Sequence, residues 1–174
     1  MVNKSVIEMK STIRIALAII VTFCISCSTM KHNIQKNNTQ TDKIIKSLLD
    51  KNGNVFYLNS TYVISSTVWT YTDDNIEIYR LTKGNVVEQS TFPDKGLSNY
   101  KVPTFKELDI ETKECGYELD GDGFGFRIKR SSELEQQDLP ISIECFTKQK
   151  YKSEFLNKIV KDINTYKLWN VQYE

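Results

Sequence analysis

Two segments of the chain place apolar residues at the spacing of one face of a helix. In the first segment these residues are Ile44, Ile45, Leu48 and Leu49. In the second they are Phe155, Leu156, Ile159, Val160 and Ile163. The sequence therefore predicts a helix over 42–51, which Asn52 and Gly53 end through a left-handed residue. It predicts a second helix from about Ser153, with Lys158 on the exposed side.

Between these helices, short runs rich in β-branched and aromatic residues predict strands. Four runs, separated by turns rich in Asp, Asn and Gly, cover 55–58, 62–71, 76–81 and 86–92. Further strands are expected over 107–112, 141–146 and 168–173. These elements predict an α+β fold: an antiparallel, meander-type sheet of about six to eight strands carries an N-terminal and a C-terminal helix on one face.

The run CGYELDGDGFGFRIKR, residues 115–130, predicts a hairpin with strands over 115–119 and 124–128. Its Asp-Gly pairs tolerate the positive φ angles that a tight turn requires. The acidic and polar residues that follow, 131–138, are expected to form a connection without a strand.

Two aspartates in this run have the spacing of the first two ligands of a calcium loop. They are Asp120 and Asp122. Phe124 and Ser131 stand where such a loop needs further oxygen ligands. The sequence therefore offers only a weak calcium candidate here and no other metal site.

Two cysteines, Cys115 and Cys145, lie in the predicted domain, each on the apolar face of an expected strand. In an exported chain such a pair favours a disulfide, and closing a loop of about 30 residues would contribute about 3 to 4 kcal/mol to stability. Two buried free thiols are the alternative, because sequence does not give the distance between them.

The first 27 residues differ in composition from the rest of the chain. Lys4, Lys10 and Arg14 precede the apolar segment IALAIIVTFCI, residues 15–25, which is eleven residues long. A helix that crosses the bilayer core needs about 20 apolar residues. A basic start, a short apolar segment and small residues after it are typical of a secretory signal peptide.

The end of this segment, CISC, residues 24–27, resembles the lipobox of bacterial lipoproteins. In that motif apolar and small residues precede a cysteine that is cleaved free at its N-terminal side and acylated. Ile25 and Ser26 match the motif, and Cys24 stands where Leu is usual. The resemblance covers the first 27 residues and implies a mature chain that begins at a lipidated Cys27.

This resemblance divides the chain into a lipoprotein signal peptide (1–26), a lipidated tether (27–40) and a single α+β domain (41–174). The tether is polar and is expected to be flexible, because it cannot bury enough apolar surface to order itself. Ser28 after the cysteine resembles the signal for the outer membrane, so the periplasmic face of that membrane is the expected location. An uncleaved anchor helix and a Cys-x-x-Cys redox pair are the alternatives.

Composition excludes several classes of function. The formal net charge is +1 and both signs are interspersed among 26% charged residues, so no nucleic-acid partner is expected. The single histidine, His32, lies in the tether, which leaves the domain without a Ser-His-Asp or Cys-His catalytic system. No phosphate-binding glycine loop is present, and we expect no cofactor.

The remaining classes are binding and carboxylate chemistry. A non-enzymatic module would bind an envelope protein or a small apolar ligand in a hollow between sheet and helices, and an immunity-type inhibitor of a partner protein would look the same. The aromatic residues that could line the hollow are Tyr62, Trp69, Tyr79, Phe126 and Trp169. The alternative is a hydrolase of envelope glycans that uses paired carboxylates. Its candidates are Glu107, Asp109, Glu118, Asp120 and Asp122.

Overall fold

The computed structural model describes residues 3–61, 63–116, 122–130 and 133–169, with side chains from Ser28 onward except that of Arg130. In chain order the elements are α1 (Asn3–Asn52), β1 (Asn54–Ser60), β2 (Ser65–Tyr71), β3 (Asn75–Thr82), β4 (Asn85–Pro93), α2 (Phe105–Thr112), the 3-10 helix η1 (Lys113–Cys115), β5 (Asp122–Arg130), β6 (Glu133–Leu139), α3 (Ile143–Lys148) and α4 (Glu154–Thr165).

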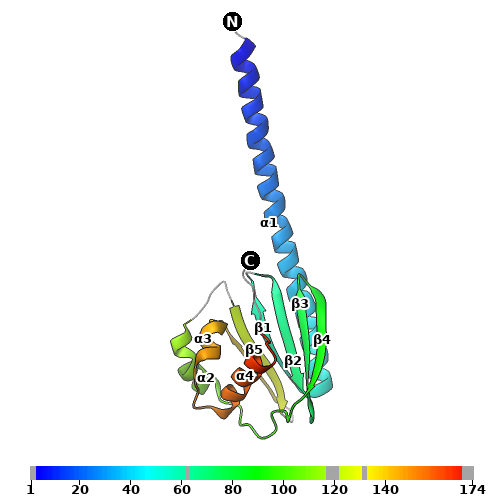
Figure 1. Ribbon diagram of the computed structural model, residues 1–174, viewed down its shortest axis with the longest axis vertical. Helices are drawn as coiled ribbons and strands as arrows, with labels where there is room; N and C mark the ends of the chain where they lie inside the picture. The colour runs from blue at the N-terminus through cyan, green and yellow to red at the C-terminus, as the bar shows by residue number, and fades with distance from the viewer. Residues whose placement is uncertain (1–2, 62, 117–121, 131–132, 170–174) are drawn as a thin grey trace.

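The six strands of the described chain form one antiparallel sheet in the order β4-β3-β2-β1-β5-β6 (Figure 1). Strands β1 to β4 follow one another as a meander, and β5 pairs with the free side of β1. The predicted α+β fold with an antiparallel sheet and a helix near each end of the chain is confirmed.

Helices cover both faces of the sheet, because its central strand is apolar on both sides. Val55 and Tyr57 of β1 pack with Leu48 of α1, whereas Phe56 and Leu58 point to the opposite face, which α2, α3 and α4 cover. The expectation that the N-terminal and C-terminal helices share one face is therefore wrong. The continuous apolar run of β1 is typical of a strand buried on both faces.

Helix α1 is much longer than predicted, and it enters the domain through polar contacts. The side chain of Asn37 is buried, donates to the Ser66 hydroxyl over 2.8 Å and accepts from the Gly84 backbone N–H over 2.9 Å. Thr41 donates to the same hydroxyl over 3.0 Å. Residues 28–40, expected as a flexible tether, are therefore helical, and their second half is docked on the sheet.

The expected strand over 107–112 is wrong, because the segment forms helix α2. Thr104 and Glu107 make a capping box: the Thr104 side chain accepts from the Glu107 N–H, and the Glu107 carboxylate accepts from the Thr104 N–H over 2.7 Å. Only one of the two alternating apolar residues is buried, since Leu108 is fully buried and Ile110 is 62% exposed.

Three further expectations in this half of the chain are wrong. The segment 141–146 contains the start of helix α3, whose first turn Ser142 caps by accepting from the Cys145 N–H. Cys115 lies in the 3-10 helix η1 rather than in a strand, and β5 pairs with β1 and β6; residues 117–119 of the expected hairpin lie outside the described residues. Strand β6 occupies the segment expected as a connection. Its polarity follows from its place at the edge of the sheet.

The predicted end of the first helix and the predicted start of the last helix are confirmed, whereas the predicted start of the first helix at residue 42 is wrong. Gly53 adopts a φ of +71° and its N–H donates to the Leu49 carbonyl over 3.0 Å, which ends α1 as predicted. Ser153 caps α4. The expected strand over 168–173 is absent at Leu168 and Trp169, and the rest of it lies outside the described residues.

Gly84 is the residue that lets α1 approach the turn between β3 and β4. Its φ is +74°, and a Cβ there would lie 2.6 Å from Cγ of Lys36 and 2.9 Å from the carbonyl carbon of Lys36. Gly53 has a similar φ, but a Cβ there would meet no atom within 4 Å. Comparing an alanine substitution at each glycine therefore separates the cost of backbone strain from the cost of disturbing the docking of α1.

We expect Gly84→Ala to lower the free energy of unfolding by about 2 to 4 kcal/mol, because it adds a clash with α1 to the left-handed strain. The control Gly53→Ala should cost only about 1 kcal/mol. Urea unfolding followed by tryptophan fluorescence measures both. Equal losses in the two variants would contradict the docking of α1 at this turn.

Candidate functional site

A cleft of about 900 Å³ lies at the end of the sheet where α1 stops. Its walls are the turn from α1 into β1, the end of β2, the loop over 95–102 and the end of β5. In Figure 1 this is the lower end of the domain, opposite the end from which α1 projects. Its polar lining includes Asn52, Asn54, Asp73, Lys95, Lys101 and Lys129.

Asn54 holds the floor of the cleft together. Its amide nitrogen donates to the Tyr71 carbonyl over 2.7 Å, and its amide oxygen accepts from the Tyr71 N–H over 2.8 Å. This side chain thus joins the first residue of β1 to the last residue of β2, beyond the last pair of their register, Phe56 and Trp69. Because its hydrogen-bonding groups are engaged, Asn54 shapes the cleft rather than offering groups to a ligand.

A buried ion network fixes the loop that forms the outer wall. The Lys158 ammonium donates to both carboxylate oxygens of Asp94, over 2.9 and 3.0 Å, and to Asp162 over 2.5 Å. The side chains of Lys158 and Asp162 are only 10% and 4% exposed. Asp94 also accepts from the Gly96 N–H over 2.9 Å, which ties the start of the loop to helix α4.

Two aromatic residues extend this network into the core. The Tyr71 hydroxyl donates to Asp162 over 2.5 Å and accepts from the indole N–H of Trp69 over 3.2 Å. Burial raises the pKa of the Tyr71 hydroxyl well above its usual value, so Tyr71 remains a donor. Burial also raises the pKa of Asp162, although the hydrogen bonds from Lys158 and Tyr71 favour its carboxylate.

This network was not predicted from the sequence, and the expectation that Lys158 lies on the exposed side of its helix is wrong. The available signal was Asp162, a carboxylate next to Ile163 on an otherwise apolar helical face. Lys158 lies four residues before it, which is the spacing of neighbours on a helix. All these groups are partnered, so the network is suited to positioning rather than to chemistry on a substrate.

The rim of the cleft carries the groups that remain available. The side chains of Asp73, Lys95, Ser98, Asn99 and Lys101 make no hydrogen bond or ion pair with any residue that the structure describes. Lys129, by contrast, is paired with Asp50 over 2.7 Å. The cleft can therefore bind a polar ligand through its loop.

The carboxylates proposed for hydrolysis do not form a described catalytic pair. Glu107 caps the start of α2, Asp109 lies on the same helix, and Asp122 is buried at the start of β5. Glu118 and Asp120 lie outside the described residues, so the calcium candidate is described only at Asp122. No group of three His, Cys, Asp or Glu side chains that could hold a metal ion occurs in the described part of the chain.

The aromatic residues expected to line an apolar hollow mostly fill the core. Trp69 and Phe126 are fully buried, and each packs on Phe56 with ring centroids 5.7 and 6.0 Å apart. Tyr79 lies on the α1 face, and Trp169 is partly buried against the core under α4. Tyr62 lies outside the described residues.

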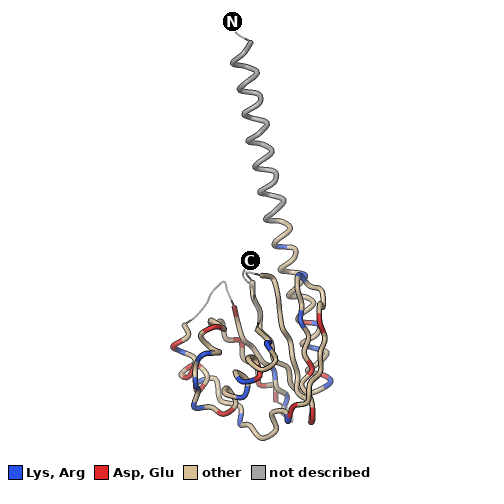
Figure 2. The backbone as a smooth tube through the Cα atoms, viewed as in Figure 1, with Lys and Arg blue, Asp and Glu red and all other residues tan. Residues whose placement is uncertain are grey.

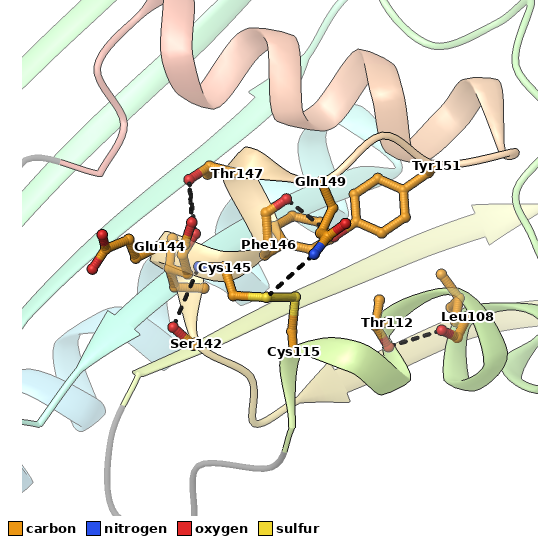
Figure 3. The surroundings of a disulfide bond; sticks show 11 residues. Leu108, Thr112, Cys115, Ser142, Glu144, Cys145, Phe146, Thr147, Gln149 and Tyr151 are labelled. Atoms are coloured by element: carbon orange, nitrogen blue, oxygen red, sulfur yellow. Dashed lines mark hydrogen bonds between the residues drawn. A yellow bond between two sulfur atoms is a disulfide. The ribbon is translucent and has the colours of Figure 1, made fainter.

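The predicted disulfide is present between Cys115 and Cys145, whose Cα atoms are 5.4 Å apart (Figure 3). It joins η1, which follows α2, to α3, so it fastens two short helices to each other. Gln149 of the following turn donates to the sulfur of Cys145 over 3.8 Å. Helices of six to eight residues have little stability of their own, and the bond restricts their separation in the unfolded chain.

Cys27 lies within α1, and its side chain is outside the described part of the structure. Its lipidation stays a prediction. No helix in the part of the chain whose side chains are described is both long enough and apolar enough to cross a bilayer. In comparisons with known proteins, no family model, no curated protein and no solved structure matches this chain.

Replacing Lys158 by Met should lower the free energy of unfolding by about 3 kcal/mol near neutral pH, because two buried carboxylates lose their shared cation. The control is Lys148→Met, which removes an exposed pair with Glu144 at the same four-residue spacing. That variant should lose less than about 0.5 kcal/mol.

The loss in Lys158→Met should shrink as the pH falls from about 7.5 to about 4.5. A carboxyl whose folded pKa is raised binds protons preferentially in the folded state, so its burial is least costly at low pH. Asp162 has such a raised pKa, and removal of Lys158 raises it further. Urea unfolding at the two pH values measures this change, and a constant loss would contradict the assignment.

Removing the disulfide with Cys115→Ser and Cys145→Ser should lower the free energy of unfolding by about 3 to 4 kcal/mol in the chain-entropy model. Alkylation of the denatured, unreduced protein followed by mass spectrometry should leave both cysteines unmodified. Labelling of either residue in the absence of reductant would show that the bond does not form.

Proposed function

We propose that this protein is a lipid-anchored protein of the bacterial cell envelope whose domain is a non-enzymatic binding module with the cleft as its site. The anchor is Cys27, for which the CISC segment resembles a lipobox. The location expected from Ser28 is the periplasmic face of the outer membrane. The cleft offers unpaired polar groups on a fixed loop, which suits recognition of a ligand or of a partner protein.

The observation that carries this proposal is the path of α1. One continuous helix includes Cys27, docks on the sheet at Asn37 and ends at Asn52 in the wall of the cleft. At about 1.5 Å per residue, the rise from Cys27 to Asn37 is about 15 Å and the rise from Cys27 to Asn52 is about 38 Å. The anchor and the cleft therefore lie at opposite ends of the same helix.

This arrangement suits a module that faces away from its membrane. Acyl chains at Cys27 would hold the projecting end of α1 at the lipid surface, since each buried CH₂ contributes about 0.8 kcal/mol and two chains or more bind stably. The cleft would then open toward the aqueous space at the far end of the domain (Figure 1). Binding is favoured over hydrolysis because Glu107, one of the proposed carboxylates, is engaged in capping α2.

We expect Cys27→Ala to abolish lipidation and to move the protein into the soluble fraction or leave an unprocessed precursor. The control is Cys24→Ala, three residues earlier, which should keep the processed, membrane-bound form. Membrane fractionation with mass spectrometry of the N-terminal peptide measures both outcomes. Unchanged processing and retention in Cys27→Ala would overturn the anchor.

A further inference from the structure

The lining of the cleft has more lysines than carboxylates, although the domain over 41–174 has a formal net charge of −3. Three lysines, Lys95, Lys101 and Lys129, line it together with one carboxylate, that of Asp73. Elsewhere in the described domain, acidic and basic residues are interspersed (Figure 2). Because Lys129 is already paired with Asp50, Lys95 and Lys101 are the cations of the cleft that form no ion pair with a described residue, and Lys101 interacts electrostatically with Glu107.

Both of these lysines lie on a loop that is held in place before any ligand arrives. Asp94 ties the start of the loop to Lys158, and the Gly96 N–H donates to Asp94. Gly96 has a φ of +66°, and a Cβ there would lie 3.0 Å from the Thr72 carbonyl oxygen, so the loop runs close to the end of β2. A preorganised loop loses less conformational entropy on binding than a mobile one.

The core also holds the middle of this loop. Three of its residues, Leu97, Tyr100 and Val102, are partly buried against the core under α4. Between them, Ser98 and Asn99 are exposed and carry a hydroxyl and an amide without partners among the described residues. Leu97, Tyr100 and Val102 also line the cleft, so the loop presents hydrogen-bonding groups, positive charge and some apolar surface to it. This pattern suits a polar ligand that also has apolar faces.

The end of α1 restricts the kind of anion that fits. Asn52 and Gly53 line the cleft at the C-terminus of the helix, where the helix dipole is negative. This end disfavours a compact dianion such as phosphate close to it. The carbonyls of Asn52 and Gly53 already accept from the Asn54 amide and from the Lys129 N–H, so the hydroxyl acceptors that the cleft offers are side chains, Asp73 among them.

We propose that the cleft binds a carboxylate-bearing oligosaccharide, with Lys95 and Lys101 at the carboxylates and with Ser98, Asn99 and Asp73 at the hydroxyls. This inference rests on the proposed function in taking the cleft as the binding site. It does not depend on the lipid anchor.

The test uses the purified full-length protein in detergent and isothermal titration calorimetry at low ionic strength. The probes are tetragalacturonic acid and its fully methyl-esterified form, which has the same ring skeleton without charge. We expect binding of the acid and about fivefold weaker binding of the acid by the double variant K95Q/K101Q, because two exposed charge contacts are lost. Added salt should weaken the wild-type interaction toward that of the variant.

A matched control removes two lysines elsewhere. K83Q/K167Q changes the net charge equally, at the turn between β3 and β4 and just after α4, outside the lining of the cleft. It should bind the acid as the wild type does. Equal weakening in both variants would mean unspecific attraction and would overturn the site.

Three other results would also overturn the proposal. They are binding of the neutral ester as tight as that of the acid, displacement of the acid by equimolar inorganic phosphate, and no binding of the acid. Membrane release of the Cys27→Ala variant is a separate readout, so a failed anchor and a failed ligand are distinguishable.

Discussion

A lysine ammonium held between two carboxylates connects the parts of this molecule that are distant in sequence. Lys158 of α4 contacts Asp162 on its own helix and Asp94 at the end of the meander, and Tyr71 of β2 completes the arrangement. Each of these charges is costly to bury alone, and their geometry offsets that cost only when all three are in place. The position of α4 on the sheet and the course of the loop over 95–102 are therefore determined together.

The sheet separates two different kinds of packing. Under α4 the core is aromatic, with Phe56, Trp69 and Phe126 in contact, and the disulfide holds the small helices above it. Under α1 the contact is partly apolar, around Leu48, and partly polar, around Asn37. The polar part fixes the position of α1 along the sheet, because a buried amide must keep its partners and cannot slide past them.

Helices and strands could be predicted where the hydrophobic periodicity extends over several residues or where characteristic turn residues mark the ends of an element. The meander, the end of α1 at Gly53 and the start of α4 at Ser153 follow from such signals. The short helices could not be distinguished from strands, since six or eight residues with two buried positions fit either period. Strand β6 was missed because an edge strand with exposed faces need not be apolar.

The disulfide was predictable from the sequence, but the cleft was not. Cys115 and Cys145 were paired from their number and compartment, whereas the cleft arises from segments far apart in the chain, from Asn52 to Lys129. Lys158 and Asp162 had a weak signal in one helical face, and their partners, Tyr71 of β2 and Asp94 after β4, had none. Contacts between polar residues that are distant in sequence are difficult to predict from a single sequence, because the local sequence around each residue does not indicate its partner.

The continuity of α1 also has a mechanical consequence. Because Asn37 is bonded to both Ser66 and the turn at Gly84, the helix and the sheet cannot pivot against each other without breaking buried hydrogen bonds. The domain and the projecting N-terminal part of α1 therefore move as one rigid body. A force or a rotation applied at the exposed residues 28–32 is transmitted through the helix to the opposite end of the domain, so the orientation of one end determines the orientation of the other.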